Sequence, residues 1–317
     1  MTELLEQNNQ EFQFEPVDLG PLLGQEEGQG TLGGMVSTNI AGSKRLKFGS
    51  ARDHILGVKA VSGRGEIFKS GGRVVKNVTG YDLSKGVTGS FGTLAALTDI
   101  TMKVMPKSET EQTLLLLGLS DAEAAEAMAL AMGSSAEVSG AAHLPAGIDG
   151  DRSKTLLRLD GFAPSVDYRI SKLGQLLSAF GDHEQLGADD SRRLWKSVSN
   201  CHFFAGDETP VWRLSCTPSE GHKLVSDLRS EQDMLAYYDW QGGLIWLKCG
   251  DGELHEDEVR TKLSEFGGGH ATLIRATANQ RQTATIFQPQ PAPLAALSQR
   301  YRENFDPKRI LNPGRMG

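Results

Sequence analysis

The chain has 317 residues, of which 33 are basic and 40 acidic, giving a net charge of −7. A hydrophobic content of 38% and a charged content of 23% are typical of a soluble globular protein long enough for two domains. The negative charge argues against a nucleic-acid-binding surface, and no apolar run approaches the roughly 20 residues that span a bilayer. The acidic, polar start, MTELLEQNNQ, is unlike a secretory signal.

The cysteine content indicates the compartment and the kind of site to expect. Cys201, Cys216 and Cys249 are widely spaced and lack the CxxC spacing of metal ligands. Their odd number favours reduced thiols in a cytoplasmic protein. We therefore predict neither disulfides nor a metal site, and three scattered cysteines cannot hold an iron–sulfur cluster of the four-cysteine type.

Short β-branched segments alternate with glycine-rich turns before Pro106. The pattern predicts strands over residues 54–63 and 65–72, joined by a tight turn. A further strand is expected within residues 92–106. The segment YDLSKGV (81–87) is short and begins near an acidic residue, which predicts one or two helical turns.

The composition changes after the polar linker at residues 107–111, where strand-like and helix-like segments begin to alternate. Strands are predicted at QTLLLLGLS, KTLLRLD, PVWRLSCTP and HATLIRA, and MLAYYDW and GLIWLKCG have the form of a hairpin. Helices are predicted after Ser120, Ser165 and Ser219, each serine as the cap, and over residues 255–265. Ser120 and Glu123 have the spacing of a capping box.

This order of segments predicts an α+β fold, with an antiparallel sheet and helices packed on one of its faces. The predicted domains are residues 1–107, residues 108–285 and a closing segment, residues 286–317. Trp212, Trp240 and Trp246 are expected to be core residues, and Cys201 and His202 a partly buried structural pair.

Small residues are concentrated between residues 28 and 57. The absence of a Cβ atom lets backbone approach a ligand closely, and successive N–H groups in turns form anion sites. There is no GxxxxGK[ST] motif, and we do not expect a GxGxxG segment to open a helix in this stretch. From spacing alone, a cofactor site and a set of tight turns both remain open. The candidate residues are Gly33, Gly34, Ser37, Thr38, Asn39, Gly42 and Ser43.

Residues 30–106 resemble the second half of the FAD-binding domain of the FAD-linked oxidases, which have the PCMH-type (vanillyl-alcohol-oxidase) fold. The ending FDPKRILNPGRM (305–316) resembles the closing motif of that family. Together with GGRVVKNVTGYDL and GGHATLIRA, these motifs are similar to the FAD-binding E-type subunits of bacterial glycolate oxidase. The resemblance implies FAD as the cofactor and a PCMH-type FAD domain followed by an antiparallel-sheet α+β domain.

The resemblance also implies which residues contact FAD. The segment GGMVSTNIAG would face the isoalloxazine ring and the diphosphate, and the backbone at residues 96–97 would lie beside the adenine half. Asn312 would return from the C-terminus to bond the pyrimidine edge of the ring, although an ordinary turn at residues 312–314 is the alternative. The implied cofactor-binding residues are Gly33, Gly34, Thr38, Asn39, Gly42, Ser43, Ala96, Leu97 and Asn312.

Two departures from the family pattern stand out. The family's FAD domain has a first half with a glycine-rich diphosphate loop, and here only about 27 residues precede GQGTLGG. We therefore expect an N-terminally truncated domain that lacks many phosphate donors and leaves the strand EFQFEPVD without a neighbour. Catalytic relatives also carry a Gly-Glu-His-Gly segment where this chain has FGGGHATLIRA, without the glutamate.

Oxidation of a 2-hydroxy acid needs a base for the hydroxyl proton and a cation for the carboxylate. His270 and Arg275 are the candidates for these two roles. The alternatives are a turn histidine at the start of a strand and a salt-bridged or solvated arginine.

Two classes of function therefore remain open. One is an FAD-dependent oxidoreductase subunit that oxidises glycolate or a similar 2-hydroxy acid, and the other is a non-catalytic assembly subunit that binds FAD weakly or not at all. The resemblance implies a second FAD-containing subunit and an iron–sulfur subunit as partners, and allows membrane association through them.

Overall fold

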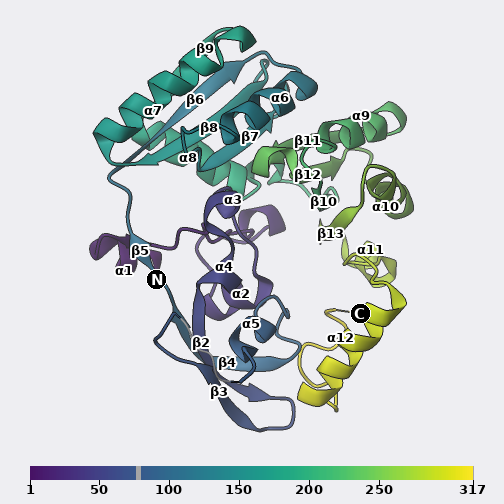
Figure 1. The fold of residues 1–317 in the computed structure, drawn as a ribbon. Coiled ribbons are helices and arrows are strands. Elements are labelled where there is room, and N and C mark those ends of the chain that lie inside the picture. Colours follow the sequence, from purple (N-terminus) through teal and green to yellow (C-terminus); the bar gives the residue numbers. More distant parts are fainter. Residues whose placement is uncertain (76–79, 317) are drawn as a thin grey trace.

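The computed structural model describes residues 1–75 and 80–316 (Figure 1). Within residues 1–106, here called the N-terminal region, a three-stranded antiparallel sheet has the order β3-β2-β4. Its strands are β2 (Ile55–Ser62), β3 (Ile67–Gly71) and β4 (Ala95–Met102). The predicted strands and the predicted helical turn, α5 (Leu83–Val87), are confirmed. The short elements α1 (Thr2–Gln7), η1 (Pro21–Leu23), α2 (Leu32–Thr38), α3 (Arg45–Phe48) and α4 (Ala51–His54) precede the sheet.

The second part of the molecule is built on one eight-stranded antiparallel sheet, here called the large sheet, with the order β13-β10-β12-β11-β7-β8-β6-β9. The predicted strands and the predicted hairpin are confirmed, whereas β7 and β9 were not predicted. The strands are β6 (Thr110–Leu117), β7 (Gly140–Leu144), β8 (Lys154–Gly161), β9 (His183–Leu186), β10 (Val211–Cys216), β11 (Met234–Asp239), β12 (Leu244–Cys249) and β13 (Gly269–Arg275).

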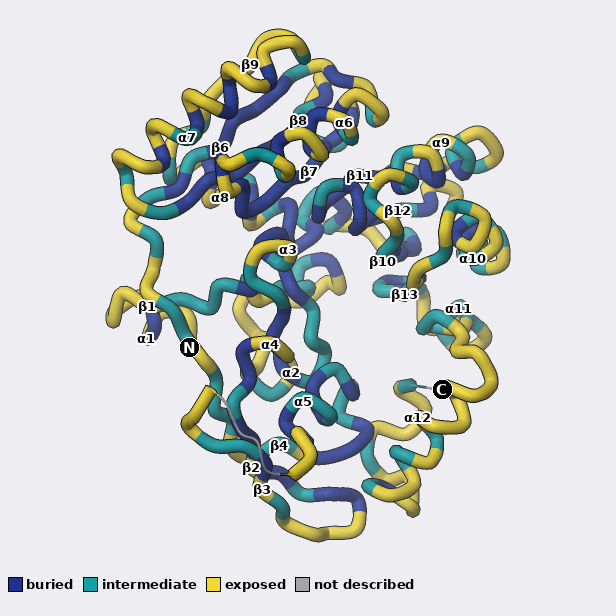
Figure 2. Tube along the Cα trace, viewed as in Figure 1, coloured by how far each residue is buried: buried dark blue, intermediate teal, exposed yellow. Residues whose placement is uncertain are grey.

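Helices cover both faces of the large sheet, so the prediction of helices on one face is wrong. One face packs against α6 (Asp121–Met132), α7 (Ala163–Leu176), α9 (Gly221–Glu231) and α10 (Glu256–Glu265). The opposite face packs against α8 (Ala188–Ser199) and η3 (His202–Phe204). The continuous apolar runs of β6 and β12 are explained by this arrangement, because strands covered on both faces do not alternate. Figure 2 shows the buried strands between these layers.

The helix caps follow the sequence in one case of three. The predicted capping box of Ser120 and Glu123 is present. The predicted cap at Ser165 is wrong, because α7 begins at Ala163 with Pro164 in its first turn, where the fixed φ of proline suits a helix. The predicted cap at Ser219 is wrong too, since α9 begins at Gly221 after Glu220.

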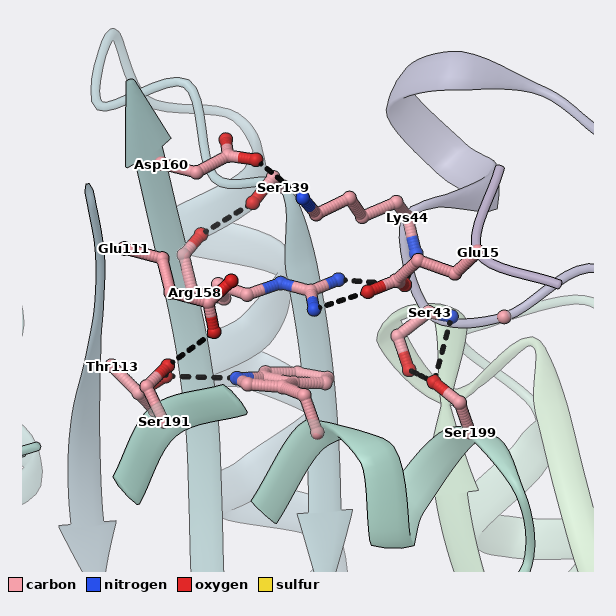
Figure 3. Close-up of polar contacts among 12 residues, drawn as sticks. Glu15, Ser43, Lys44, Glu111, Thr113, Ser139, Arg158, Asp160, Ser191 and Ser199 are labelled. Atoms are coloured by element: carbon pink, nitrogen blue, oxygen red, sulfur yellow. Dashed lines mark hydrogen bonds and ion pairs between the residues drawn. The ribbon is translucent and has the colours of Figure 1, made fainter. Parts of the chain in front are cut away.

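The N-terminal region is joined to the large sheet by buried charges (Figure 3). Arg158 of β8 donates to both carboxylate oxygens of Glu15, at 2.6 and 2.9 Å, and Lys44 pairs with Asp160 at 2.8 Å. The expected exposed strand at residues 11–18 is therefore wrong. Only Gln10–Glu11 forms a strand, β1, which pairs with β5 (Met105–Pro106), and Phe14 is fully buried.

The C-terminal segment (residues 286–316) returns to the N-terminal region. Its helix α12 (Ala292–Phe305) follows α11 (Ala278–Thr283). Tyr301 and Phe305 of α12 pack against the hydrophobic core of the three-stranded sheet. Beyond the helix, Asn312 Nδ2 donates to the carbonyl oxygen of Phe91 at 2.8 Å. The described part of the chain contains no helix long and apolar enough to cross a membrane. The domain boundaries at residues 107 and 285 stay predictions.

Candidate functional site

A cavity of about 830 Å³ lies where the N-terminal region, the β10–β13 edge of the large sheet and the C-terminal segment meet. Thr38 and Asn39 contribute to one wall, Arg213 and His270 to a second, and Arg315 to a third. Residues from both ends of the chain therefore form one site. Its volume is within the range of about 300–1,000 Å³ that small-molecule sites have.

Two of the nine predicted cofactor residues line this cavity. Thr38 is the last residue of α2, and Asn39 follows it in the left-handed conformation at φ 53°. The Asn39 side-chain oxygen accepts a hydrogen bond from the Arg52 backbone N–H at 2.9 Å, which orients the amide. The end of α2 thus presents a hydroxyl and an oriented amide at the cavity wall.

The expectation that no GxGxxG opens a helix is wrong, because the glycines of residues 28–33 lead directly into α2. Gly33 and Gly34 lie in the first turn of this helix and are not among the described residues that line the cavity. A Cβ atom on Gly33 would have no neighbour within 4 Å, and one on Gly34 would lie 3.2 Å from Thr31 Oγ1. Gly33 therefore faces open space, which suits the approach of a large ligand without identifying one.

Gly42 and Ser43 lie at the junction, which is the contact between the N-terminal region and the large sheet, and both pack against other residues there. A Cβ atom on Gly42 would lie 2.8 Å from the Cβ of Glu15, and Ser43 Oγ donates to Asp239 at 2.6 Å. Trp240 Nε1 donates to the Gly42 carbonyl oxygen at 3.0 Å. In this structure these small residues let the loop dock closely on the large sheet.

Ala96 and Leu97 pair with Val61 and Ala60 of β2, away from the cavity-lining residues. Asn312 donates from Nδ2 to the Phe91 carbonyl oxygen and holds the following residues at the cavity wall, and its contact with the flavin pyrimidine stays a prediction. Its amide also fills the space beside Gly92, where a Cβ atom would lie 2.7 Å from Asn312 Nδ2. Protein contacts thus explain this glycine.

Both predicted catalytic residues line the cavity, but their environments differ. His270 is exposed near the start of β13, where it pairs across the ladder with Ser215 of β10. Arg275 is buried at the other end of β13 and its guanidinium is fully engaged. It donates to the carbonyl oxygens of Thr209, Phe204 and Leu22 at 2.6–3.1 Å and to Asp207 at 2.6 Å.

Three cavity residues that lie together, Arg45, Arg213 and Trp240, were not predicted as site residues, and of these the sequence singled out Trp240 alone, as a core residue. The guanidinium of Arg213 lies 4.8 Å from the centroid of a Trp240 ring, and that of Arg45 lies 4.9 Å from it. Burial, together with the positive charge of Arg45, lowers the pKa of Arg213 to about 10. The signal in the sequence was an arginine inside the otherwise apolar strand VWRLSC. Trp240 is buried, as predicted.

The donor set of the cavity fits the ring system of FAD. Apolar side chains such as Leu22 and Ile40 and the ring of Phe91 offer surface for a flat aromatic group. Thr38 and Asn39 offer hydrogen bonds, and Arg213 offers positive charge. This mixture of apolar walls with a few polar groups is typical of cofactor sites.

The comparisons with known proteins agree with this fit. A family model described as "FAD binding domain" matches residues 19–71. The chain is 32% identical to "Glycolate oxidase subunit GlcE" of Escherichia coli (strain K12) over 290 residues, which are 91% of this chain and 72% of that protein. It is 35% identical to "Glycolate oxidase subunit GlcD" of Bacillus subtilis (strain 168), over 90% of this chain and 68% of that protein.

Solved structures share the fold at low sequence identity. An alkyldihydroxyacetonephosphate synthase matches with a TM-score of 0.63 at 14% identity, over 99% of this chain and 62% of that chain. The VAO-type flavoprotein MtVAO615 of Myceliophthora thermophila matches with a TM-score of 0.62 at 13% identity, over 98% and 63%. The predicted fold class is thereby confirmed, and so is FAD as the cofactor of this family. The chain belongs to the FAD-linked oxidase family, among the glycolate oxidase subunits.

Proposed function

We propose that the chain is the FAD-binding subunit of a glycolate oxidase-type complex that oxidises glycolate or a similar 2-hydroxy acid to the 2-oxo acid. The observation that carries this proposal is the shared cavity, which Thr38 and Asn39 line from the N-terminal region and His270 lines from the large sheet. A cofactor contact and a candidate proton acceptor are thus on one site, as the chemistry requires.

FAD supplies the two-electron acceptor in such an oxidation when it is bound. In our proposal, Thr38 and Asn39 bind the polar edge of the ring. His270 accepts the hydroxyl proton of the acid, because its imidazole is exposed and lines the cavity. Arg275 has a positioning role, since it ties β13 to η1 and η3 through carbonyl acceptors.

The alternative is a non-catalytic assembly subunit, and two observations favour it. The segment GGGH lacks the glutamate of the catalytic relatives, and Arg275 is committed to protein acceptors rather than to a ligand. For either role we propose assembly with a second flavin subunit and an iron–sulfur subunit. Any membrane association would then come through these partners.

His270→Ala in the assembled complex separates the two roles. If His270 is the base, we expect turnover to fall by about 10²-fold or more while flavin absorbance stays unchanged. His183→Ala, on the far edge strand β9, is the matched control and should keep full activity. Loss of less than about tenfold at normal flavin content would favour the assembly role.

A further inference from the structure

Arg213 is a partly buried cation that forms no ion pair with a carboxylate of the described residues, although the charge of Asp239 attracts it. Its Nε atom is buried without a hydrogen-bond partner in the described part of the chain, and its only ring contacts are with Trp240 and Trp246. The nearest buried carboxylate, Asp239, is instead bonded by Ser43 and by the Trp240 backbone N–H. A guanidinium taken out of water without an acceptor costs free energy, so this arrangement calls for an anion.

Arg45 adds a second positive charge to the same place. It comes from α3 in the N-terminal region, whereas Arg213 comes from β10, yet both contact Trp240 and both line the cavity. No ion pair within the described residues neutralises either of them. Arg275, by contrast, is paired with Asp207, and Arg281 donates to the Ile274 carbonyl oxygen.

We propose that Arg213, assisted by Arg45, binds the carboxylate of a short 2-hydroxy acid, with the Trp240 ring as its floor. The planar fork of a guanidinium matches a carboxylate in two parallel hydrogen bonds, and stacking on an indole keeps the fork oriented. This assigns to Arg213 the anion-binding role that the sequence suggested for Arg275. The identity of the acid rests on the function proposed above.

The register of the sheet supports a short acid in particular. Arg213 pairs with Thr272, and Ser215 pairs with His270, so all four side chains share one face. Arg213 and His270 are thus diagonal neighbours, whose Cα atoms are roughly 7–8 Å apart in such a ladder. A carboxylate and a hydroxyl on adjacent carbon atoms fit between the tips of two such side chains.

Because the two arginines belong to different regions, a bound carboxylate bridges the junction. Ligand binding to the folded chain alone should therefore raise its melting temperature as well as saturate the site. Trp240 provides a direct optical signal, since the anion would lie beside its ring.

The test is a titration of the flavin-free full chain with glycolate and with oxalate, followed by Trp fluorescence, calorimetry and melting temperature. Inorganic phosphate is a separate arm, because a phosphate group would meet the same guanidinium. We expect saturable binding of the carboxylates and weaker binding of phosphate. Arg213→Gln should weaken carboxylate binding by about tenfold to hundredfold, the scale of a lost charge-assisted hydrogen bond.

Matched variants keep the result interpretable. Arg213→Lys keeps the charge but loses the fork and should fall between wild type and Arg213→Gln, whereas Arg300→Gln, on the exposed face of α12, should bind like wild type. If Arg213→Gln fails to fold, Arg45→Gln replaces it and should lose several-fold. Trp240→Phe should lose the optical signal while calorimetry still detects binding.

Equal affinity of wild type and both glutamine variants for oxalate would overturn the inference, and so would tighter binding of phosphate than of either carboxylate. Because no turnover is measured, the inference and the proposed function can fail separately. If the chain binds carboxylates but its complex oxidises no hydroxy acid, the inferred anion site is supported and the proposed function is wrong.

Discussion

The large sheet and the N-terminal region differ in what stabilises them. The large sheet has hydrophobic clusters on both faces, built from tryptophan, tyrosine and leucine side chains. The N-terminal region has one cluster of small side chains around Val36, Ile55 and Val58. A small core buries little apolar surface, so the N-terminal region depends more on its docking to the large sheet.

The docking surface contains charged pairs in addition to the apolar contact that Leu22 makes with the large sheet. Glu15 and Lys44 reach from the N-terminal region to Arg158 and Asp160 of β8 (Figure 3). The Arg158 guanidinium lowers the pKa of Glu15 against the effect of burial. Such a pair adds little net stability compared with apolar packing, but it is very sensitive to the loss of one partner. The comparison therefore predicts that substitutions at these charged pairs lower the stability of the molecule most.

The largest effect is expected for Arg158→Met, which leaves the partly buried Glu15 carboxylate without its ion-pair partner. We expect a loss of about 3–5 kcal/mol in the free energy of unfolding, measured by urea denaturation. The double variant Glu15→Gln/Arg158→Met should recover much of this loss. Lys154→Met on the same strand removes only a part-exposed pair with Asp149 and should cost at most about 1 kcal/mol. Equal costs for the two single variants would contradict the comparison.

A second, smaller effect concerns pH. Burial raises the pKa of the Asp239 carboxyl to about 6, against a hydrogen bond from Ser43. Since this folded-state pKa is above the unfolded value of about 3.9, the folded state holds the proton more tightly. The contribution of Asp239 is therefore fully present below about pH 4 and is lost as the pH rises to 6 and above, by up to about 3 kcal/mol.

Unfolding experiments at several pH values between 4 and 7.5 check this sign. The free energy of unfolding of wild type, minus that of Asp239→Asn, should fall as the pH rises through this window. The subtraction removes the contributions of other titrating groups near Asp239, including Glu11 and Glu15. A difference that is flat or rises with pH would show that Asp239 is ionised at no cost in the folded state.

The smallest effect tests the large sheet region alone. Ser120→Ala removes the capping box of α6 and should cost about 1 kcal/mol. Ser165→Ala, inside α7 rather than at its cap, should stay within about 0.5 kcal/mol. If Ser165→Ala lowered the free energy of unfolding as much as Ser120→Ala, Ser165 would act as a helix cap, contrary to the start of α7 at Ala163.

The fold was predictable where local pattern decides it. The short apolar run LIWL is bounded by glycines and belongs to the predicted hairpin, so its length and its flanking residues indicated a strand. Helix α8 was not predicted, because it begins with the charged segment ADDSRR and its large buried apolar side chains are only Trp195 and Val198. Coverage of the second sheet face follows from that helix, so it was missed as well.

The site was only partly predictable, because its groups come together through tertiary packing. Thr38 and Asn39 were identified from the cluster of small residues and from the family resemblance, and His270 from the comparison with catalytic relatives; all three line the cavity. Arg213 and Arg45 could be recognised as candidate site residues only from their shared contact with Trp240, which lies on a different element from each of them. For the same reason the sequence did not show that the Arg275 guanidinium donates to protein carbonyl groups, since these acceptors are distant in the sequence.

The contact between Asn312 and Phe91 has a consequence for the order in which the molecule matures. These residues are far apart along the chain, and the wall of the cavity extends from Leu19 to Met316. Contacts between distant segments form late in folding, and during synthesis the N-terminal part emerges first. The cavity is therefore incomplete until residues 312–316 have been synthesised and have folded back onto the N-terminal region. A ligand that needs the whole cavity would bind only after that step.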